Sequence, residues 1–285
     1  MATTLIVNPY ATGVSRELAD AVARELGAER VLETKARGHA TELASEVVDG
    51  VVVVFSGDGG FNEVLNGLRP HVVVGFVPGG GTSVLPRALG LPHDPVAAAR
   101  RIAGGRKRRI SLGRANGRRF GFSAGIGFDA ELVRRMDARG RDRQGRRPGD
   151  VVFAWTALRL LAEHRARFAD CLEVEGAGRA AFALVANADP YSYAGPVPLH
   201  LVRNARFEGG LDLVAPRSLR PQHLPGVLRH LLTGRSQLPL LQLRDRDRIV
   251  VRCDRPTPLQ LDGEDCGDVT EVVLEAERGA VDVLI

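Results

Sequence analysis

Two acidic motifs with glycine neighbours contain the residues of this chain that are best suited to chemistry. The first, Ser56-Gly57-Asp58-Gly59-Gly60, follows Val51–Phe55, an apolar run that predicts a strand buried on both faces of a parallel sheet. A glycine turn between a strand and a helix leaves backbone N–H groups free to bind phosphate. Because an acid in this turn repels bare phosphate, we expect Asp58 to act through Mg²⁺, water or a ribose hydroxyl. The alternative is an ordinary βα turn that uses glycine only for its conformational freedom.

The second motif is Asp262-Gly263-Glu264, close to the other end of the chain. Its two acids are separated by one residue, so both carboxylates would face the same side if the segment were extended. That arrangement would give a site two neighbouring acids. The alternative is a pair of acids at an exposed turn around Gly263.

The first hundred residues alternate between predicted strands and helices. Strands are predicted at 5–7, 31–34, 51–55 and 72–77, and helices at 18–26, 40–47, 62–68 and 95–102. Ser15 and Asp94 are suitable N-caps for the first and last helix, and Asn62 and Glu63 are expected in the first turn of the third. This order with short loops predicts a parallel sheet with helices on both faces. Ligands of such sheets bind at the carboxyl ends of the strands, where the glycine loops lie.

Beyond residue 110 the pattern changes to short strands. Asn116-Gly117 is typical of a tight hairpin, and short apolar runs separated by turns predict an antiparallel sandwich. Helices are expected at 152–164 and 224–232, with Phe153 and Trp155 in the core rather than in contact with lipid. We therefore expect one domain at 1–110, to which 280–285 is a candidate addition, and a second at 111–279. The cleft between two domains is the expected site.

The composition describes a soluble globular chain of 285 residues, with 44% hydrophobic and 26% charged residues. No apolar run reaches the roughly 20 residues that span a bilayer, and no signal peptide is visible. Three cysteines without metal-ligand spacing favour free thiols in a reducing cytoplasm.

The net charge of +5 comes almost entirely from arginine, since the chain has only two lysines. The basic residues form two groups, which are Arg100, Arg101, Arg106, Lys107, Arg108 and Arg109, and Arg134, Arg135, Arg139, Arg141, Arg143, Arg146 and Arg147. Each group is interpreted either as a solvated surface or as a surface attracted to anionic lipid headgroups. Nucleic acid is a poorer candidate because aromatic residues make up only 5% of the chain.

The motifs together resemble the diacylglycerol kinase catalytic-domain family, the bacterial lipid kinases related to sphingosine and ceramide kinases. The resemblance covers nearly the whole chain and depends on motifs in family order, which are Asn8-Pro9, Thr34 with His39-Ala40, Gly57-Asp58-Gly59 with 62–67, Pro78 to Pro92, Phe122 with Gly125 to Asp129, and Asp262-Gly263-Glu264. It implies an α/β first domain, doubly wound and mostly parallel like that of NAD kinases, which holds ATP. The antiparallel second domain would hold a lipid.

The resemblance also implies roles for single residues. Those expected to line the nucleotide are Asn8, Thr34, Gly57, Asp58, Gly59, Gly60, Asn62, Glu63, Gly81 and Thr82. Asp262 would be the base that takes a proton from the lipid hydroxyl, with Glu264 beside it. This is chemically coherent, because phosphoryl transfer needs positioning, Mg²⁺ and one acceptor for the hydroxyl proton. A structural metal site of the family is placed at Glu208 with the carbonyls of Ala205 and Gly210, and a metal-free turn is the alternative.

Several positions depart from the family pattern. The usual Gly-Gly-Asp-Gly-Thr loop has Ser56 for its first glycine and Gly60 for its threonine. Ser83 and Ser123 stand where asparagine is frequent, and Leu85-Pro86 replaces Phe-Ala. Lost side-chain donors near the phosphates would each cost about 1 kcal/mol unless backbone N–H groups substitute for them.

The leading hypothesis is an ATP-dependent kinase of diacylglycerol or a related lipid alcohol, with ATP and Mg²⁺ as cofactors. It would be cytoplasmic, touch the membrane peripherally to reach its lipid, bind no nucleic acid and form a candidate homodimer. One rival is a soluble-substrate kinase of the NAD-kinase type. The other is a lipid- or nucleotide-binding protein without turnover.

Overall fold

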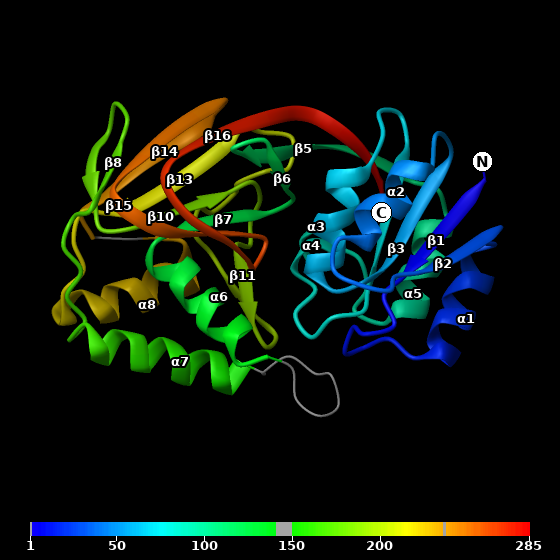
Figure 1. Cartoon of the computed structure of the whole chain (residues 1–285), viewed down its shortest axis with the longest axis horizontal. Coiled ribbons are helices and arrows are strands. Elements are labelled where there is room, and N and C mark those ends of the chain that lie inside the picture. The colour runs from blue at the N-terminus through cyan, green and yellow to red at the C-terminus, as the bar shows by residue number, and fades with distance from the viewer. Residues whose placement is uncertain (1, 141–149, 236–237) are drawn as a thin grey trace. The chain divides into compact units, whose positions relative to one another are not determined.

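The computed structural model describes residues 2–140, 150–235 and 238–285, and it divides into two compact units (Figure 1). Of the described residues, those up to Leu112 and those from Arg278 to Ile285 form the first unit. Those from Gly113 to Glu277 form the second. The boundaries fall inside two strands, β5 (Lys107–Ala115) and β16 (Glu264–Leu284), which therefore contribute residues to both units.

The first unit contains the predicted parallel sheet. Its strands lie in the order β2 (Arg30–Glu33), β1 (Thr3–Val7), β3 (Val51–Ser56) and β4 (Val73–Pro78). All are parallel, and every residue of β3 and β4 is buried, as expected for strands with helices on both sides. The end of β16 adds to the free side of β4, with Val283 opposite Val74.

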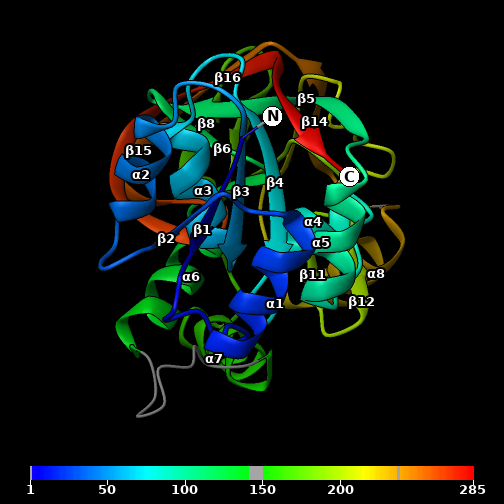
Figure 2. The ribbon, with the colours of Figure 1, turned by 90° about the vertical axis from the view of Figure 1, so that its right-hand side faces the viewer.

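Five helices accompany this sheet, which are α1 (Arg16–Leu26), α2 (His39–Glu46), α3 (Asp58–Gly67), α4 (Val84–Ala88) and α5 (Pro95–Ala103). Figure 2 shows the pair α2 and α3 on one side of the strands and the pair α1 and α5 on the other. The predicted caps are confirmed, since Ser15 accepts a hydrogen bond from the Leu18 amide and Asp94 from the Ala97 amide. The predicted start of α3 is wrong. The helix begins at Asp58, so the glycines form its first turn rather than a loop before it.

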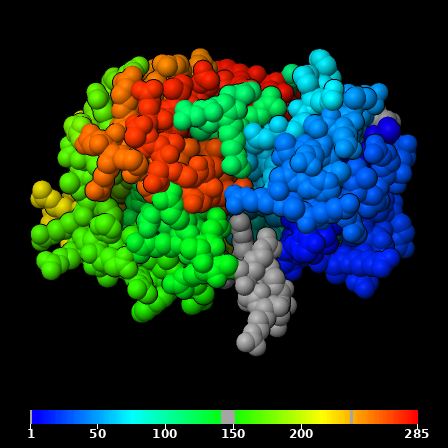
Figure 3. Space-filling model, in the orientation of Figure 1, coloured from blue at the N-terminus to red at the C-terminus, as the bar shows by residue number. Residues whose placement is uncertain are grey.

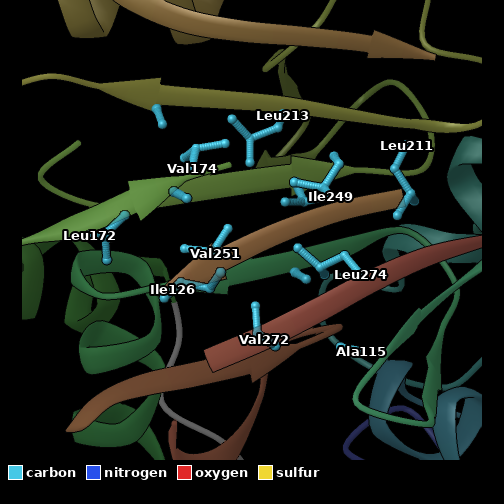
Figure 4. Close-up of a cluster of buried hydrophobic side chains, with 14 of the residues drawn as sticks. Ala115, Ile126, Leu172, Val174, Leu211, Leu213, Ile249, Val251, Val272 and Leu274 are labelled. Atoms are coloured by element: carbon cyan, nitrogen blue, oxygen red, sulfur yellow. The ribbon is translucent and has the colours of Figure 1, made fainter. Parts of the chain in front are cut away.

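The second unit is built from antiparallel strands. Its strands are β6 (Arg118–Phe120), β7 (Ser123–Ile126), β8 (Leu172–Val174), β9 (Gly178–Ala180), β10 (Ala183–Ala186), β11 (Ser192–Ala194), β12 (Val197–Leu199), β13 (Leu211–Pro216), β14 (Leu240–Arg246) and β15 (Arg248–Leu261), with most of β5 and β16. The hydrogen-bonded path runs β14-β13-β10-β7-β15-β16, with β8 joined to β15. One apolar core lies between strands of this path, where Leu213 and Val174 face Val251 and Leu274 (Figure 4). The expected antiparallel β-fold is confirmed, and its facing layers belong to one hydrogen-bonded sheet.

Three helices and a short 3₁₀ turn, Pro221–His223, complete the second unit. The predicted helices are α7 (Asp150–Glu163) and α8 (Leu224–Thr233), and α6 (Phe128–Ala138) was not predicted. The expectation that Phe153 and Trp155 are core residues is wrong, because they are 42 and 63% exposed. The structure instead buries Thr156 and Leu160 of the same helix.

The hairpin β15–β16 carries the second acidic motif at its tip. Leu261 pairs with Glu264, so Asp262 and Gly263 form a two-residue turn with φ angles of 51° and 78°. Two positive φ angles are typical of a type I′ hairpin turn. The segment is therefore not extended, and the premise used to place both carboxylates on one side is wrong.

Candidate active site

Three loops of the first unit meet backbone to backbone at the carboxyl ends of β1, β3 and β4. The Gly13 amide donates to the Gly79 carbonyl at 2.8 Å, and the Gly79 amide donates to the Ser56 carbonyl at 2.7 Å. A Cβ atom on Gly80 would lie 2.8 Å from the Cα of Gly57, closer than real contacts allow. Glycine is therefore required at position 80 so that the β3–α3 and β4–α4 connections can approach each other.

The Asp58 side chain joins two of these loops. Its carboxylate accepts hydrogen bonds from the Val84 amide at 3.1 Å and the Leu85 amide at 3.2 Å, the first two residues of α4. Asp58 is itself the first residue of α3, whose first-turn amides, including those of Gly59 and Gly60, have no acceptor within the helix. The site thus combines helix N-terminal amides that suit an anion with one acid fixed among them.

Three of the residues expected to line the nucleotide are buried or have contacts within the first unit. Asn62 is fully buried, and its Oδ1 accepts a hydrogen bond from Asn66. The Glu63 carboxylate accepts from the amides of Gly38 and Ala40 at 2.8 and 3.2 Å, which caps the start of α2. Thr34 is also buried. These residues support the loops, and their role as nucleotide contacts stays a prediction.

The Asp262 carboxylate in the second unit is buried and binds three backbone amides. Oδ2 accepts from Gly121 at 2.6 Å, and Oδ1 accepts from Phe122 at 2.9 Å and Ser123 at 3.1 Å. Donors of this kind stabilise the ionised form of a carboxylate and fix its orientation. The three amide donors therefore hold this acid at a defined place.

Glu264 lies beside Asp262 and is also buried. Its Oε2 accepts a hydrogen bond from Arg118 Nη2 at 3.1 Å, so this acid is paired with a cation. Both acids of the motif thus contact the stretch from Arg118 to Ser123, although the turn between them is not extended.

A polar cluster behind the Asp262 turn was not among the predicted site residues. Asp129 Oδ2 accepts hydrogen bonds from the Tyr191 hydroxyl and from Gln260 Nε2, both at 2.7 Å. Gln260 Oε1 in turn accepts from the amide of Gly263 at 2.8 Å. Burial raises the pKa of Asp129, and the two hydrogen bonds only partly oppose this. The motif Gly125 to Asp129 drew attention to Asp129, but nothing in the sequence pointed to Tyr191 or Gln260.

Residues 2–115 match the family model described as the diacylglycerol kinase catalytic domain. This segment is thus similar to the diacylglycerol kinase catalytic domain. The diacylglycerol kinase of Bacillus subtilis strain 168 is 28% identical over 192 residues, which are 65% of this chain and 57% of that protein. The alignment thus spans little more than half the length of this relative. The resemblance read from the motifs is confirmed.

Solved structures support the fold. A diacylglycerol kinase from Bacillus anthracis strain Sterne has a TM-score of 0.70 at 20% identity, over 99% of this chain and 96% of that one. An NAD kinase from Archaeoglobus fulgidus, solved in complex with ATP, has a TM-score of 0.52 at 12% identity, over 99% and 93% of the two chains. At these identities the likeness shows the fold, and the predicted fold class is confirmed.

The β3–α3 loop of the first unit differs from the family's usual Gly-Gly-Asp-Gly-Thr loop at two positions that contact each other, 56 and 60. A Cβ atom on Gly60 would overlap the Ser56 hydroxyl and lie 2.7 Å from the Ser56 Cβ. The Ser56 hydroxyl therefore occupies the space that a side chain at position 60 would need, and it accepts a hydrogen bond from Asn8 Nδ2 at 3.1 Å. The family pattern has its hydroxyl side chain in the helix, at position 60, whereas this loop has it at the end of the strand, at Ser56.

The β4–α4 loop of the first unit is held by Ser83, which stands where the family pattern usually has asparagine. Ser83 has a left-handed φ of 48°, and its hydroxyl lies 3.2 Å from the amide and 3.1 Å from the carbonyl of Gly80. A Cβ on Gly81 would meet nothing within 4 Å, and Thr82 is half-buried. Gly81 and Thr82 therefore keep their place among the candidate ligand contacts.

The metal site expected at Glu208, Ala205 and Gly210 stays a prediction. The Gly210 amide donates to Asp245 Oδ1 at 2.7 Å, and the Asp245 amide donates to Asp212 Oδ1 at 3.0 Å. Across the described ranges, no three or more His, Cys, Asp or Glu side chains are grouped as metal ligands.

Proposed function

We propose that this chain is an ATP-dependent lipid kinase that phosphorylates the hydroxyl of diacylglycerol or a related lipid alcohol. The observation that carries the proposal is the set of three glycine loops joined backbone to backbone inside a segment that matches the diacylglycerol kinase catalytic domain. Residues 1–110 with 280–285 would bind the nucleotide, and residues 111–279 would bind the lipid. The compact units end within a few residues of this division, which supports the assignment.

The nucleotide phosphates would bind the first-turn amides of α3, with Asn8, Gly57, Gly81 and Thr82 around them. Asp58 fits Mg²⁺, because this ion is usually bound by one or two carboxylates together with substrate phosphates. The Asp58 carboxylate is the acid held among these loops, two hydrogen bonds fixing it to the start of α4. When bound, Mg²⁺ neutralises charge on the transferred phosphoryl group.

Asp262 would accept the proton of the lipid hydroxyl. It accepts hydrogen bonds from three amides, and donors of this kind favour the ionised form of a carboxylate, which is the form that can take up a proton. The Arg118–Glu264 pair and the Asp129–Gln260 contact support the turn from both sides. The kinase would act in the cytoplasm at the membrane surface, and a homodimer is a further expectation that sedimentation equilibrium tests.

The experiment that tests the proposal is phosphorylation with labelled ATP and Mg²⁺ in liposomes that contain diacylglycerol or other lipid alcohols. Label in the lipid phase supports the lipid kinase. Label transferred to NAD or another soluble acceptor supports the rival that the NAD-kinase likeness suggests. ATP binding without transfer to any acceptor supports a binding protein and contradicts the kinase.

A further inference from the structure

Helix α7 of the second unit turns its most apolar face outward. Val151, Trp155 and Leu158 are 83, 63 and 59% exposed and recur at helical spacing, with the exposed Ala154 and Ala162 between and beyond them. We call these five residues the outer face of α7. The helix lies at the surface of its unit in Figures 1 and 3.

The opposite side of α7 already anchors the helix. Thr156 and Leu160 are 2 and 1% exposed, and the Thr156 hydroxyl donates to the Val152 carbonyl at 2.7 Å. Leu161 packs against the cluster formed by Phe182, Leu219 and their neighbours. The outer face is therefore not needed to attach the helix. A contiguous exposed patch with tryptophan and leucine is typical of a surface that binds a protein or a membrane.

The charges around α7 favour an anionic surface as that partner. Arg165 and Arg167 follow the helix and are exposed, and Arg167 and Arg220 line one hollow. Two acids near the end of the helix are already paired, Glu163 with Arg135 and Arg159, and Asp170 with Arg179. Exposed tryptophan and leucine side chains with arginines beside them suit the membrane interface, where tryptophan is enriched and arginine meets anionic headgroups.

The basic groups noted in the sequence contribute less to this attraction than their number suggests. Arg134 is paired with Asp265 and Asp268, and Arg109 with Asp282. Arg141, Arg143, Arg146 and Arg147 lie outside the described residues.

Among residues 2–140, 150–235 and 238–285, no helix combines the length and the apolar character needed to cross a membrane.

A second copy of the chain is a weaker candidate for the partner. The outer face consists of five side chains on one helix, whereas a stable interface uses roughly 20–30 residues on each side.

We propose that the outer face of α7 docks on an anionic lipid bilayer and inserts Trp155 and Leu158 at the headgroup level. The inference rests on the proposed function, because a lipid kinase must reach its acceptor in a membrane.

Trp155 reports on this contact directly, because it is the only tryptophan of the chain. The full chain is mixed with vesicles of phosphatidylcholine alone or with phosphatidylglycerol, and its tryptophan emission is recorded with and without brominated acyl chains. We expect a blue shift and quenching with the anionic vesicles, and a weaker response with the neutral ones. Vesicle binding that leaves the emission unchanged and unquenched would overturn the proposal. So would a blue shift that follows protein concentration without vesicles, together with dimers in sedimentation equilibrium.

A matched pair of variants gives a second readout, vesicle co-sedimentation. Leu158→Ser should weaken binding about tenfold, as expected for the loss of one buried apolar side chain. Val48→Ser in the first unit, where Val48 is 64% exposed, is the control and should bind like the parent. Equal binding of Leu158→Ser and the parent would contradict the docking. Phosphoryl transfer to diacylglycerol in detergent micelles tests the two proposals separately. A tryptophan response to vesicles without phosphoryl transfer would contradict only the kinase activity. Phosphoryl transfer without a tryptophan response would contradict only the docking of α7.

Discussion

The glycine loops of the first unit and the Asp262-Gly263 turn of the second, which we call the acid turn, each fix a carboxylate by hydrogen bonds from backbone amides. Asp58 binds two amides at the start of α4, and Asp262 binds three amides between Gly121 and Ser123. Asp58 lies among the glycine loops, where Gly80 leaves no space for a Cβ atom. The motif of Asp262 is also contacted by two polar side chains, those of Arg118 and Gln260. The first region would therefore offer backbone amides to a ligand, whereas the second would offer the acidic side chains of Asp262 and Glu264.

The largest expected effect tests the acid turn. Asp262→Asn removes the charge and leaves one of three amide donors facing an NH₂ group. Transfer should fall by roughly 10²–10⁴-fold, and the free energy of unfolding by about 1–3 kcal/mol. ATP affinity should stay unchanged, because the loops of the first unit are intact. Initial rates, denaturant melts and ATP titrations measure these three quantities.

Asp268→Asn is the control for this prediction, because Asp268 is a half-exposed acid near the same turn. It should keep the parent rate. A normal rate in Asp262→Asn would reject the base assignment.

The next largest effect tests the backbone contact of the glycine loops. Gly80→Ala places a Cβ atom 2.8 Å from the Cα of Gly57, so the two loops must separate. Overpacking of this kind costs about 1–3 kcal/mol, and we expect ATP affinity to fall by about tenfold or more. Val48→Ala, a change at a position that is 64% exposed in the same unit, is the control and should bind ATP like the parent. Isothermal titration of both variants measures the difference, and equal affinities would show that the close approach is unimportant.

A smaller effect tests the exchange of side chains between positions 56 and 60. Gly60→Thr should destabilise the chain by about 1–3 kcal/mol, because the new side chain overlaps Ser56. Adding Ser56→Gly should restore most of this loss, since the overlapping group is then gone. A double-mutant cycle in urea measures the coupling between the two positions. Additive effects would contradict the reciprocal packing.

The smallest effect concerns the titration of the polar cluster behind the acid turn. Burial raises the pKa of Asp129 above its ordinary value of 3.8, so the folded chain keeps a proton that the unfolded chain has lost. Stability should therefore decrease as the pH rises from about 3.8 through the folded pKa. Asp129→Asn can still accept both hydrogen bonds through Oδ1 and should lose this pH dependence. Urea midpoints of the parent and of Asp129→Asn, measured between pH 3.5 and 7, test this prediction. If the midpoints of both proteins changed with pH in the same way, the prediction would be refuted.

The sequence predicted those parts of the fold that depend on neighbours along the chain. The caps Ser15 and Asp94 and the turn at Asn116-Gly117 each use contacts within a few residues, and the buried strand Val51–Ser56 is marked by its unbroken apolar run. Their residue types therefore contain the necessary information. The start of α3 was missed because glycines in its first turn lower the helix propensity that a local analysis detects.

The parts of the candidate site that were missed depend on contacts distant in sequence. Glu63 caps a helix that begins 24 residues earlier, and the amides that hold Asp262 lie about 140 residues before it. The motifs named both acids correctly as residues of interest, but no spacing rule says what a carboxylate binds after folding. Trp155 was misplaced because a helical apolar pattern predicts a buried face without saying which face that is.

The overlap between positions 56 and 60 restricts how such a loop can change over time. A chain with hydroxyl side chains at both positions would have two groups in one space, whereas a chain with glycine at both would only leave a small gap. A stepwise route between the two loop types therefore passes through the double-glycine form. Homologues should include that form and avoid the crowded one, so the order in which these two substitutions were fixed can be read from packing alone.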